Sequence, residues 1–306
     1  MIQHSPNQKE VTRGAKKMPR ERMTPAPAGR ICLQPRDLEI MVFLDRFNYA
    51  LRGQIEEAFF DSVACCNARM RSLFDWGYCA KALVPLPYEM GAVYGCQAVY
   101  TCGSASHPLL AQHWGCDVSV VRARRRHATP NFLLHTLEEV NFYLQVRRGL
   151  REWPAIQLER YLGEWEAYHE YEFRPLPPSR EEWKRECYKP DALMILSGRG
   201  GRAGYSIEID RGHSSANALL QKVRLHERYR QRGLFLKRYG VEQEKTLLVT
   251  TSPKRRDHLR ELFREEGSDL FWVSTFEELK AQGVFGSIWQ PAQGKGARRL
   301  SVLGKE

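Results

Sequence analysis

Three carboxylates flank a glycine-rich turn in the C-terminal half of the sequence. Asp191 begins a short apolar segment, and Glu208 and Asp210 lie at the end of a second one. Residues 197–203 between them contain three glycines, which is typical of a turn that joins antiparallel strands. With the turn centred at 199–200, Asp191 lies opposite Glu208, and Asp210 shares the strand face of Glu208 because side chains alternate along a strand. The pattern therefore predicts that the three side chains converge at one end of a β-hairpin.

Carboxylates this close repel one another unless a proton or a cation lies between them. Oxygen ligands of this kind suit Mg²⁺ or Mn²⁺, which are the expected cofactors, and the carbonyl of Ile209 can supply a further ligand. Such a cation can polarise a phosphoryl oxygen and activate an attacking water. Both faces of the hairpin are largely apolar, which predicts inner strands of a sheet that is covered on both sides.

The motif Pro190-Asp191…Glu208-x-Asp210 resembles the signature of PD-(D/E)XK nucleases, with Asp210 in the place of the final lysine. The resemblance implies a restriction-endonuclease-like α/β domain that hydrolyses DNA phosphodiesters, with Asp191, Glu208 and Asp210 as catalytic metal ligands. The elements that the sequence predicts around the motif follow a similar order: a helix near 156–171, the hairpin, a helix at 214–232, a strand at 246–251, a helix at 254–263 and a strand at 270–274.

The aspartate at the lysine position departs from that signature. In the nuclease signature the lysine positions the nucleophilic water and stabilises developing charge, which an anion cannot do. Lys222 on the following helix can reach the site, and its spacing places it on one helix face with His226 and Tyr229. We expect Lys222 to orient the water; the alternative is that it is one of several surface cations. The candidates for a helix acid that completes the metal shell are Glu164, Glu166 and Glu170.

The first 120 residues are predicted to form three helices and a β-ribbon. Pro35 suits the first turn of a helix, and apolar residues then repeat at helical spacing in three runs that Gly77 ends. Extended segments at 78–86 and 98–101 follow, joined by a turn near 89–91. This order is typical of a winged helix-turn-helix unit, whose third helix reads DNA. Docking of another protein is the alternative, and the expected DNA contacts on the third helix are Asn67, Arg69 and Arg71.

A basic run follows this unit. Such runs are usually solvated surface, and one run cannot distinguish a DNA contact from a free linker. Its position after the predicted DNA-reading unit favours phosphate contacts, which we expect from Arg122, Arg124, Arg125 and Arg126.

The combination of the two units resembles the replication-relaxation family of plasmids and integrative elements. The matching stretches are 36–38, 68–73, 134–137 and the acidic motif at 190–191 and 208–211, so the resemblance covers roughly residues 36–275. It implies a DNA nickase or endonuclease that acts in replication, relaxation or transfer of a mobile element. A non-cutting DNA-binding accessory protein and a transcriptional regulator are the alternatives. DNA is the expected partner, with a homodimer or other replication and transfer proteins of the element as further candidates.

The composition, with 42% hydrophobic and 27% charged residues, is that of a globular protein. The sequence contains no apolar stretch of the roughly 18 residues that a membrane span needs, and its start lacks the apolar core of a signal peptide. We therefore expect a cytoplasmic protein with reduced cysteines and no metal held by cysteines. Both ends of the chain are basic, and phosphate contacts and solvated tails are equally open for them. The expected divisions are a disordered basic arm at 1–34, a winged-helix domain at 35–120, a basic linker with a connecting helix at 121–154, a nuclease-like α/β domain at 155–290 and a basic tail at 291–306.

Overall fold

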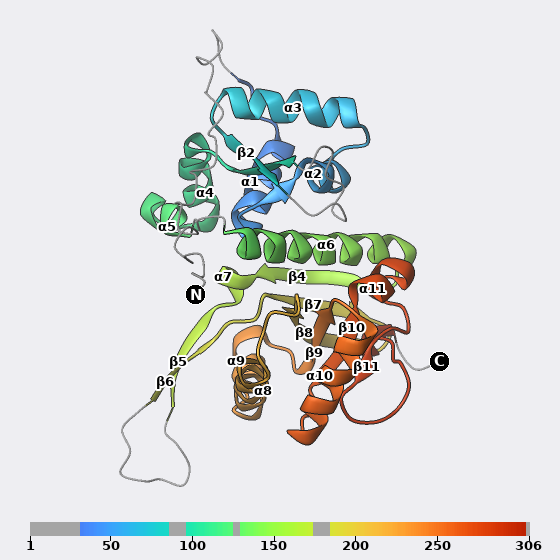
Figure 1. The fold of residues 1–306 in the computed structure, drawn as a ribbon. Helices are drawn as coiled ribbons and strands as arrows, with labels where there is room; N and C mark the ends of the chain where they lie inside the picture. Colours follow the sequence, from blue (N-terminus) through green and yellow to red (C-terminus); the bar gives the residue numbers. More distant parts are fainter. Residues whose placement is uncertain (1–30, 86–95, 125–128, 174–183, 304–306) are drawn as a thin grey trace, which may run out of the picture.

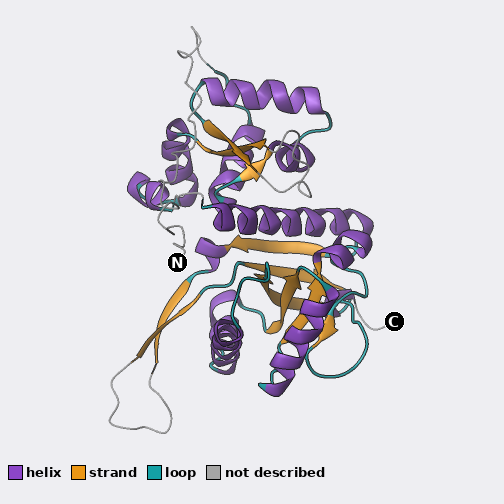
Figure 2. Cartoon of the chain, in the orientation of Figure 1, coloured by secondary structure: helices purple, strands orange, loops and turns teal. Residues whose placement is uncertain are grey.

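The computed structural model describes residues 31–85, 96–124, 129–173 and 184–303 of the chain. The long helix α6 (Pro130–Glu152) lies between an N-terminal group of helices with a small sheet and a larger, six-stranded sheet with its own helices (Figure 1). Helices and strands are mixed throughout, so the predicted α/β class is confirmed (Figure 2).

Three helices and a β-ribbon make up the N-terminal group. Pro35 begins α1, and the Ser62 hydroxyl caps α3 by accepting a hydrogen bond from the Cys65 amide at 3.3 Å. The antiparallel sheet has the order β1-β3-β2. The predicted order of three helices and a ribbon is therefore confirmed, while the turn predicted near 89–91 lies outside the described residues. The bounds are α1 Pro35–Phe47, β1 Ala50–Leu51, α2 Arg52–Phe59, α3 Val63–Asp75, β2 Cys79–Pro85 and β3 Cys96–Cys102.

Helix α6 joins the two halves through a shared core. Thr129 caps its start by accepting a hydrogen bond from the Phe132 amide at 3.3 Å. One hydrophobic cluster runs from Phe47 in α1 through Val140 in α6 to Met194 in the large sheet. Because the cluster is continuous, α6 is a packed layer of the fold and not a loose linker. Two short helices precede it, α4 His107–Trp114 and α5 Val118–Ala123.

The large sheet has the strand order β11-β10-β9-β8-β7-β4. Strands β8, β9 and β10 are parallel, and the remaining pairs are antiparallel. Alternate residues of β9 face different layers: Leu247 packs into the core shared with α6, and Leu248 packs with α8 and α10. The bounds are β4 Gln157–Gly163, β7 Ala192–Gly198, β8 Gly201–Ile209, α8 Ala216–Gln231, α9 Leu234–Tyr239, β9 Gln243–Thr250, α10 Pro253–Glu265, β10 Phe271–Thr275, α11 Phe276–Gln282 and β11 Gln290–Pro291.

The predicted register of the central hairpin is confirmed. Ala192 pairs with Ile207, and Met194 pairs with Tyr205, as a turn centred at 199–200 requires. The strands are buried on both faces, since α6 and α8 cover them from opposite sides.

One prediction about the elements beside the hairpin is wrong. The helix predicted near 156–171 is instead β4, the short helix α7 (Glu164–Ala167) and β5 (His169–Phe173), which pairs with β6 (Lys184–Tyr188). The edge of β7 offers β4 an antiparallel ladder, with one irregularity between Leu158 and Arg160, and that long-range pairing outweighs the local helical spacing. On the face of the hairpin opposite α8, the helix that packs is α6, which comes earlier in the chain.

The basic tail expected at 291–306 packs on the fold near its described end, while residues 293–299 are exposed. Leu300 and Val302 are buried, and the Val302 carbonyl accepts a hydrogen bond from the Gly200 amide at 3.1 Å. A side chain at Gly198 would come within 2.3 Å of that same carbonyl, so the turn needs glycine there for this close approach. Apolar residues within the basic segment thus hold it on the hairpin turn.

Candidate metal centre

The backbone of the hairpin itself fixes Asp191. Its amide donates to the Ile207 carbonyl at 3.1 Å, and its Oδ2 accepts from the Ile209 amide at 2.7 Å. The residue is buried at the open end of the hairpin, where both α6 and α8 reach it. Burial raises the pKa of Asp191, but the charges of Lys222 and His135 outweigh it and hold the pKa well below its usual range. Asp191 is therefore an ionised, buried carboxylate.

Glu208 and Lys222 form an ion pair next to Asp191. The Glu208 side chain is only 2% exposed, and its Oε2 contacts the Lys222 amine, which lies 3.8 Å from Asp191 Oδ1. Burial lowers the pKa of Lys222, but the two carboxylates raise it above its usual value. The expected reach of Lys222 from α8 to both carboxylates is thus present in the structure.

A buried hydrogen-bond network holds Glu208 from behind. His226 Nε2 lies 2.9 Å from Glu208 Oε1, while its Nδ1 lies 3.1 Å from the Thr246 hydroxyl and 3.3 Å from the Tyr188 hydroxyl. When Nδ1 accepts from one of these hydroxyls, Nε2 carries the proton and donates to Glu208. His226 and Tyr229 lie on the buried face of α8, as their spacing from Lys222 predicts. The network therefore fixes the orientation of the Glu208 carboxylate.

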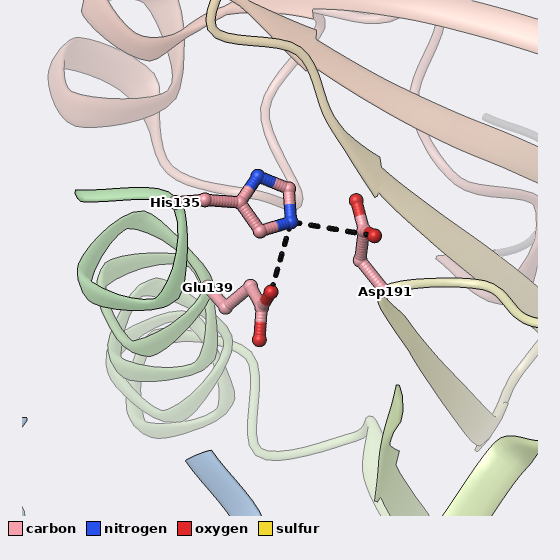
Figure 3. A group of neighbouring side chains, drawn as sticks. All are labelled: His135, Glu139 and Asp191. Atoms are coloured by element: carbon pink, nitrogen blue, oxygen red, sulfur yellow. Dashed lines mark ion pairs between the residues drawn. The ribbon is translucent and has the colours of Figure 1, made fainter. Parts of the chain in front are cut away.

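Helix α6 brings two further ligand-type side chains to Asp191 (Figure 3). His135 Nε2 lies 3.0 Å from Glu139 Oε1 and 3.3 Å from Asp191 Oδ1. Burial lowers the pKa of His135, but Asp191 and Glu139 outweigh it and raise the pKa to about 11. Burial also raises the pKa of Glu139 to about 7 despite His135, and the like charges of Asp191 and Glu164 add to this rise. The centre thus joins His135 and Glu139 to the predicted carboxylates.

Sequence reasoning missed the role of His135 and Glu139. Their spacing of four residues on an amphipathic helix was a usable signal, and His135 lies within the stretch 134–137 that carries the family resemblance. The three acids that sequence reasoning considered for the shell each pair with a cation, although Glu164 also lines a cavity with Glu139. Glu164 pairs with Lys189 at 2.8 Å, Glu166 pairs with Arg46 at 2.6 Å, and Glu170 pairs with Arg185 at 3.1 Å.

Asp210 borders the same small cavity as Glu208 and Lys222, but its carboxylate is already bonded. Its Oδ2 accepts from the Thr250 hydroxyl at 2.7 Å and from Arg255 Nε at 3.0 Å. Burial raises the pKa of Asp210, and the bonds from Arg255 and Thr250 outweigh it, so that the pKa is lowered. The structure therefore places Asp210 beside the centre, with an arginine as its cation.

The residues predicted to contact DNA differ in how far they are free to do so. Asn67 and Arg122 are exposed, and the Arg71 side chain is 61% exposed although it pairs with Asp75 on its own helix. Arg69 forms an ion pair with the fully buried Asp37 of α1. Arg124 stacks 3.5 Å over the Trp165 ring and pairs with Asp45 at 3.3 Å, while Arg125 and Arg126 lie outside the described residues. Arg69 and Arg124 thus join helices within the fold.

A family model described as replication-relaxation matches residues 42–244, about two thirds of the chain. The chain belongs to the replication-relaxation family. The match spans the long helix α6, the hairpin and α8, and so includes the carboxylates of the centre together with His135 and Lys222. No curated protein matches this replication-relaxation protein. None of the helices in its described segments combines the length and apolar character needed to cross a bilayer.

Proposed function

We propose that this replication-relaxation protein is a divalent-metal-dependent DNA nickase or endonuclease of a plasmid or other mobile element. The observation that carries the proposal is the position of Lys222, whose amine contacts Glu208 and lies 3.8 Å from Asp191. The nuclease signature has a lysine at the position of Asp210, and this chain does not. In this proposal Lys222 of α8 takes the place of that lysine.

In the proposed reaction, Asp191 and Glu208 hold Mg²⁺ or Mn²⁺ and Asp210 assists from the edge of the cavity. The cation supplies polarisation of a phosphoryl oxygen and activation of water. His226 keeps the Glu208 carboxylate in one orientation, so that the ligand is preorganised. Lys222 has three donor protons, and the two that do not face Glu208 are available to a water or to a phosphate oxygen.

The arrangement of the elements supports the same function. The order α6, β4, β7, β8, α8, β9 is similar to the helix, hairpin, helix and strand order of the nuclease-like fold. In the N-terminal half, α1, α2 and α3 followed by the β2–β3 ribbon are similar to a winged helix. In this proposal the outer face of α3 binds DNA through Asn67 and Arg71, and Arg122 of α5 adds a phosphate contact.

The test is a nicking assay on supercoiled plasmid that carries the origin or transfer region of the element. We expect the wild-type chain to nick it with Mg²⁺ or Mn²⁺ and not with EDTA. Glu208→Gln keeps the shape of the side chain but removes a metal ligand, so it should reduce nicking on the order of 100-fold or more while DNA binding stays within about twofold. Wild-type protein that binds this DNA and never cuts it with either cation would refute the nuclease proposal.

A non-cutting accessory protein is the second candidate, and one observation favours it. The carboxylates of the centre are already neutralised by cations of the chain: Asp191 by Lys222 and His135, and Asp210 by Arg255. A purely structural ion-pair network predicts that neither Mg²⁺ nor Mn²⁺ raises the melting temperature. The metal titration described in the Discussion separates the two functions without any cutting assay.

A further inference from the structure

The group formed by His135, Glu139 and Asp191 differs chemically from the all-oxygen site of the proposed nuclease. One imidazole nitrogen and two carboxylate oxygens, each from a different side chain, lie within 4.8 Å of one another. Glu139 and Asp191 are each 7% exposed, so their charges need compensation from inside the protein. In Figure 3 the three side chains point toward one another from α6 and from the start of β7.

The scaffold around this group is rigid. His135 and Glu139 lie one turn apart on α6, so their side chains leave the helix on the same face. Between them, Thr136 and Leu137 are buried at 1% and 0% exposure, which anchors this turn of the helix. Asp191 is fixed by its hydrogen bond from the Ile209 amide. The three side chains therefore start from buried parts of the fold, a packed turn of α6 and the end of the hairpin.

A cavity on the side of the N-terminal half borders one member of the group, Glu139. It has a volume of about 110 Å³, and its lining includes Thr136, Glu139 and Glu164. A bound water needs roughly 10–15 Å³ of such volume, so the cavity has room for a hydrated ion and several waters. This space leaves room for water ligands beside Glu139, and Arg46 and Arg124 line other parts of it.

We propose that His135, Glu139 and Asp191 form a second cation site, which takes a transition-metal ion of the Zn²⁺ class in preference to Mg²⁺. Imidazole nitrogen binds Zn²⁺, Co²⁺ and Ni²⁺ well, whereas Mg²⁺ takes oxygen ligands almost exclusively. Three protein ligands with an open position suit a Zn²⁺ ion that keeps a water. The inference rests on the proposed function only in that the two sites share Asp191.

The test measures Zn²⁺ and Mg²⁺ binding to the untagged full chain by calorimetry. We expect wild-type protein to bind Zn²⁺ on the order of 100-fold more tightly than Mg²⁺. His135→Gln should weaken Zn²⁺ binding on the order of tenfold or more. It should not weaken Mg²⁺ binding, because it removes no oxygen ligand and takes away a cation that competes for Asp191. The matched control is His258→Gln, which changes an exposed histidine on α10 and should leave both affinities unchanged. Unchanged Zn²⁺ binding in His135→Gln would overturn the inference.

X-ray absorption at the zinc edge gives a second measurement, on wild-type protein alone. Zinc in this site shows one imidazole together with oxygen ligands, and a shell of oxygens only, or of sulfur, overturns the inference. The outcomes also separate this inference from the nuclease proposal. Zn²⁺ binding that depends on His135, without nicking in Mg²⁺ or Mn²⁺, supports the second site and refutes the nuclease. Nicking with Zn²⁺ binding that ignores His135 does the reverse.

Discussion

Replacement of Lys222 by methionine tests whether the centre binds metal or is a structural ion-pair network. Methionine keeps most of the aliphatic stem and removes the charge that faces two buried carboxylates, Glu208 at 2% and Asp191 at 9% side-chain exposure. Loss of one partner from a buried ion pair costs roughly 3–5 kcal/mol. The Lys222 side chain is 41% exposed, so water screens part of the interaction, and we expect a loss of about 2 kcal/mol in EDTA.

A divalent cation should reverse this loss, because it takes the place of the missing ammonium group. Binding at a concentration of about 100 times Kd stabilises a protein by roughly 2.7 kcal/mol. Lys222→Met should therefore melt about 4 °C below wild type in EDTA and gain more from Mg²⁺ or Mn²⁺ than wild type does, since the lysine no longer competes for the carboxylates. Nicking should still be lost in the variant, because the water is no longer oriented.

The control for this experiment is Lys189→Met. The Lys189 side chain is also 41% exposed and pairs with Glu164 at 2.8 Å, but this carboxylate is more exposed, at 18%. We expect a loss below about 1 kcal/mol and no change in the response to metal. The assay is thermal melting followed by circular dichroism, in EDTA and across a metal titration. If Lys222→Met is destabilised and no cation restores it, the carboxylates do not bind metal and the reasoning fails.

Three further predictions concern residues whose partners the structure identifies. Arg69→Met leaves the fully buried Asp37 unpaired, so it should lower the free energy of unfolding by about 3 kcal/mol in urea, whereas Arg71→Ala should change it by less than about 0.5 kcal/mol. Burial raises the pKa of Asp37, but the bonds from Arg69 outweigh burial and lower the pKa, so this pair stabilises the fold above about pH 4 and the stability is lost as the pH falls further. In a urea series from pH 6 to pH 3, the free energy of unfolding should therefore fall less steeply in Arg69→Met than in wild type. An equal fall in both proteins would contradict the assignment. Asp210→Asn should weaken Mg²⁺ binding by less than about tenfold in calorimetry, because Arg255 already holds that carboxylate, and a larger effect would make Asp210 a direct ligand.

The hairpin is the part of the fold that sequence reasoning predicted best. Strand alternation and a glycine-rich turn are both local, so the register that pairs Ala192 with Ile207 follows from residues within about one hairpin length. The same holds for the face of α8 that carries Lys222 and His226, since a helical period fixes it over two turns. These two local patterns were enough to predict that an amine could reach both carboxylates.

The segment after α6 was predicted wrongly for the opposite reason. Residues 157–163 have helical spacing, yet they form β4 because β7 provides hydrogen-bond partners 29 to 40 residues away in the chain. A strand at the edge of a sheet gains its stability from that neighbour, and no local pattern carries this information. The helix that covers this face of the hairpin is therefore α6, which precedes the predicted one, and it brings Glu139 to Asp191.

The sequence also did not show which basic side chains form ion pairs within the fold and which are exposed. Arg69 and Arg71 are indistinguishable by type and helix, yet Arg69 pairs with Asp37, 32 residues earlier, and Arg71 remains mostly exposed. Arg124 is likewise held by Asp45, 79 residues earlier. Whether a basic side chain forms an ion pair within the protein or stays exposed to a ligand depends on which acidic side chains the tertiary structure places near it.

The sequence by itself thus determined the family, the α/β class, the hairpin register and the approach of Lys222 to the two carboxylates. The tertiary structure decided that α6 packs on the hairpin and brings His135 and Glu139 to Asp191, more than fifty residues away. Periodicity constrains only the neighbours of a residue along one helix or hairpin. Contacts between distant elements depend on which apolar faces pack together. The packing of α6 on the hairpin is what brings the His135 imidazole to the carboxylates.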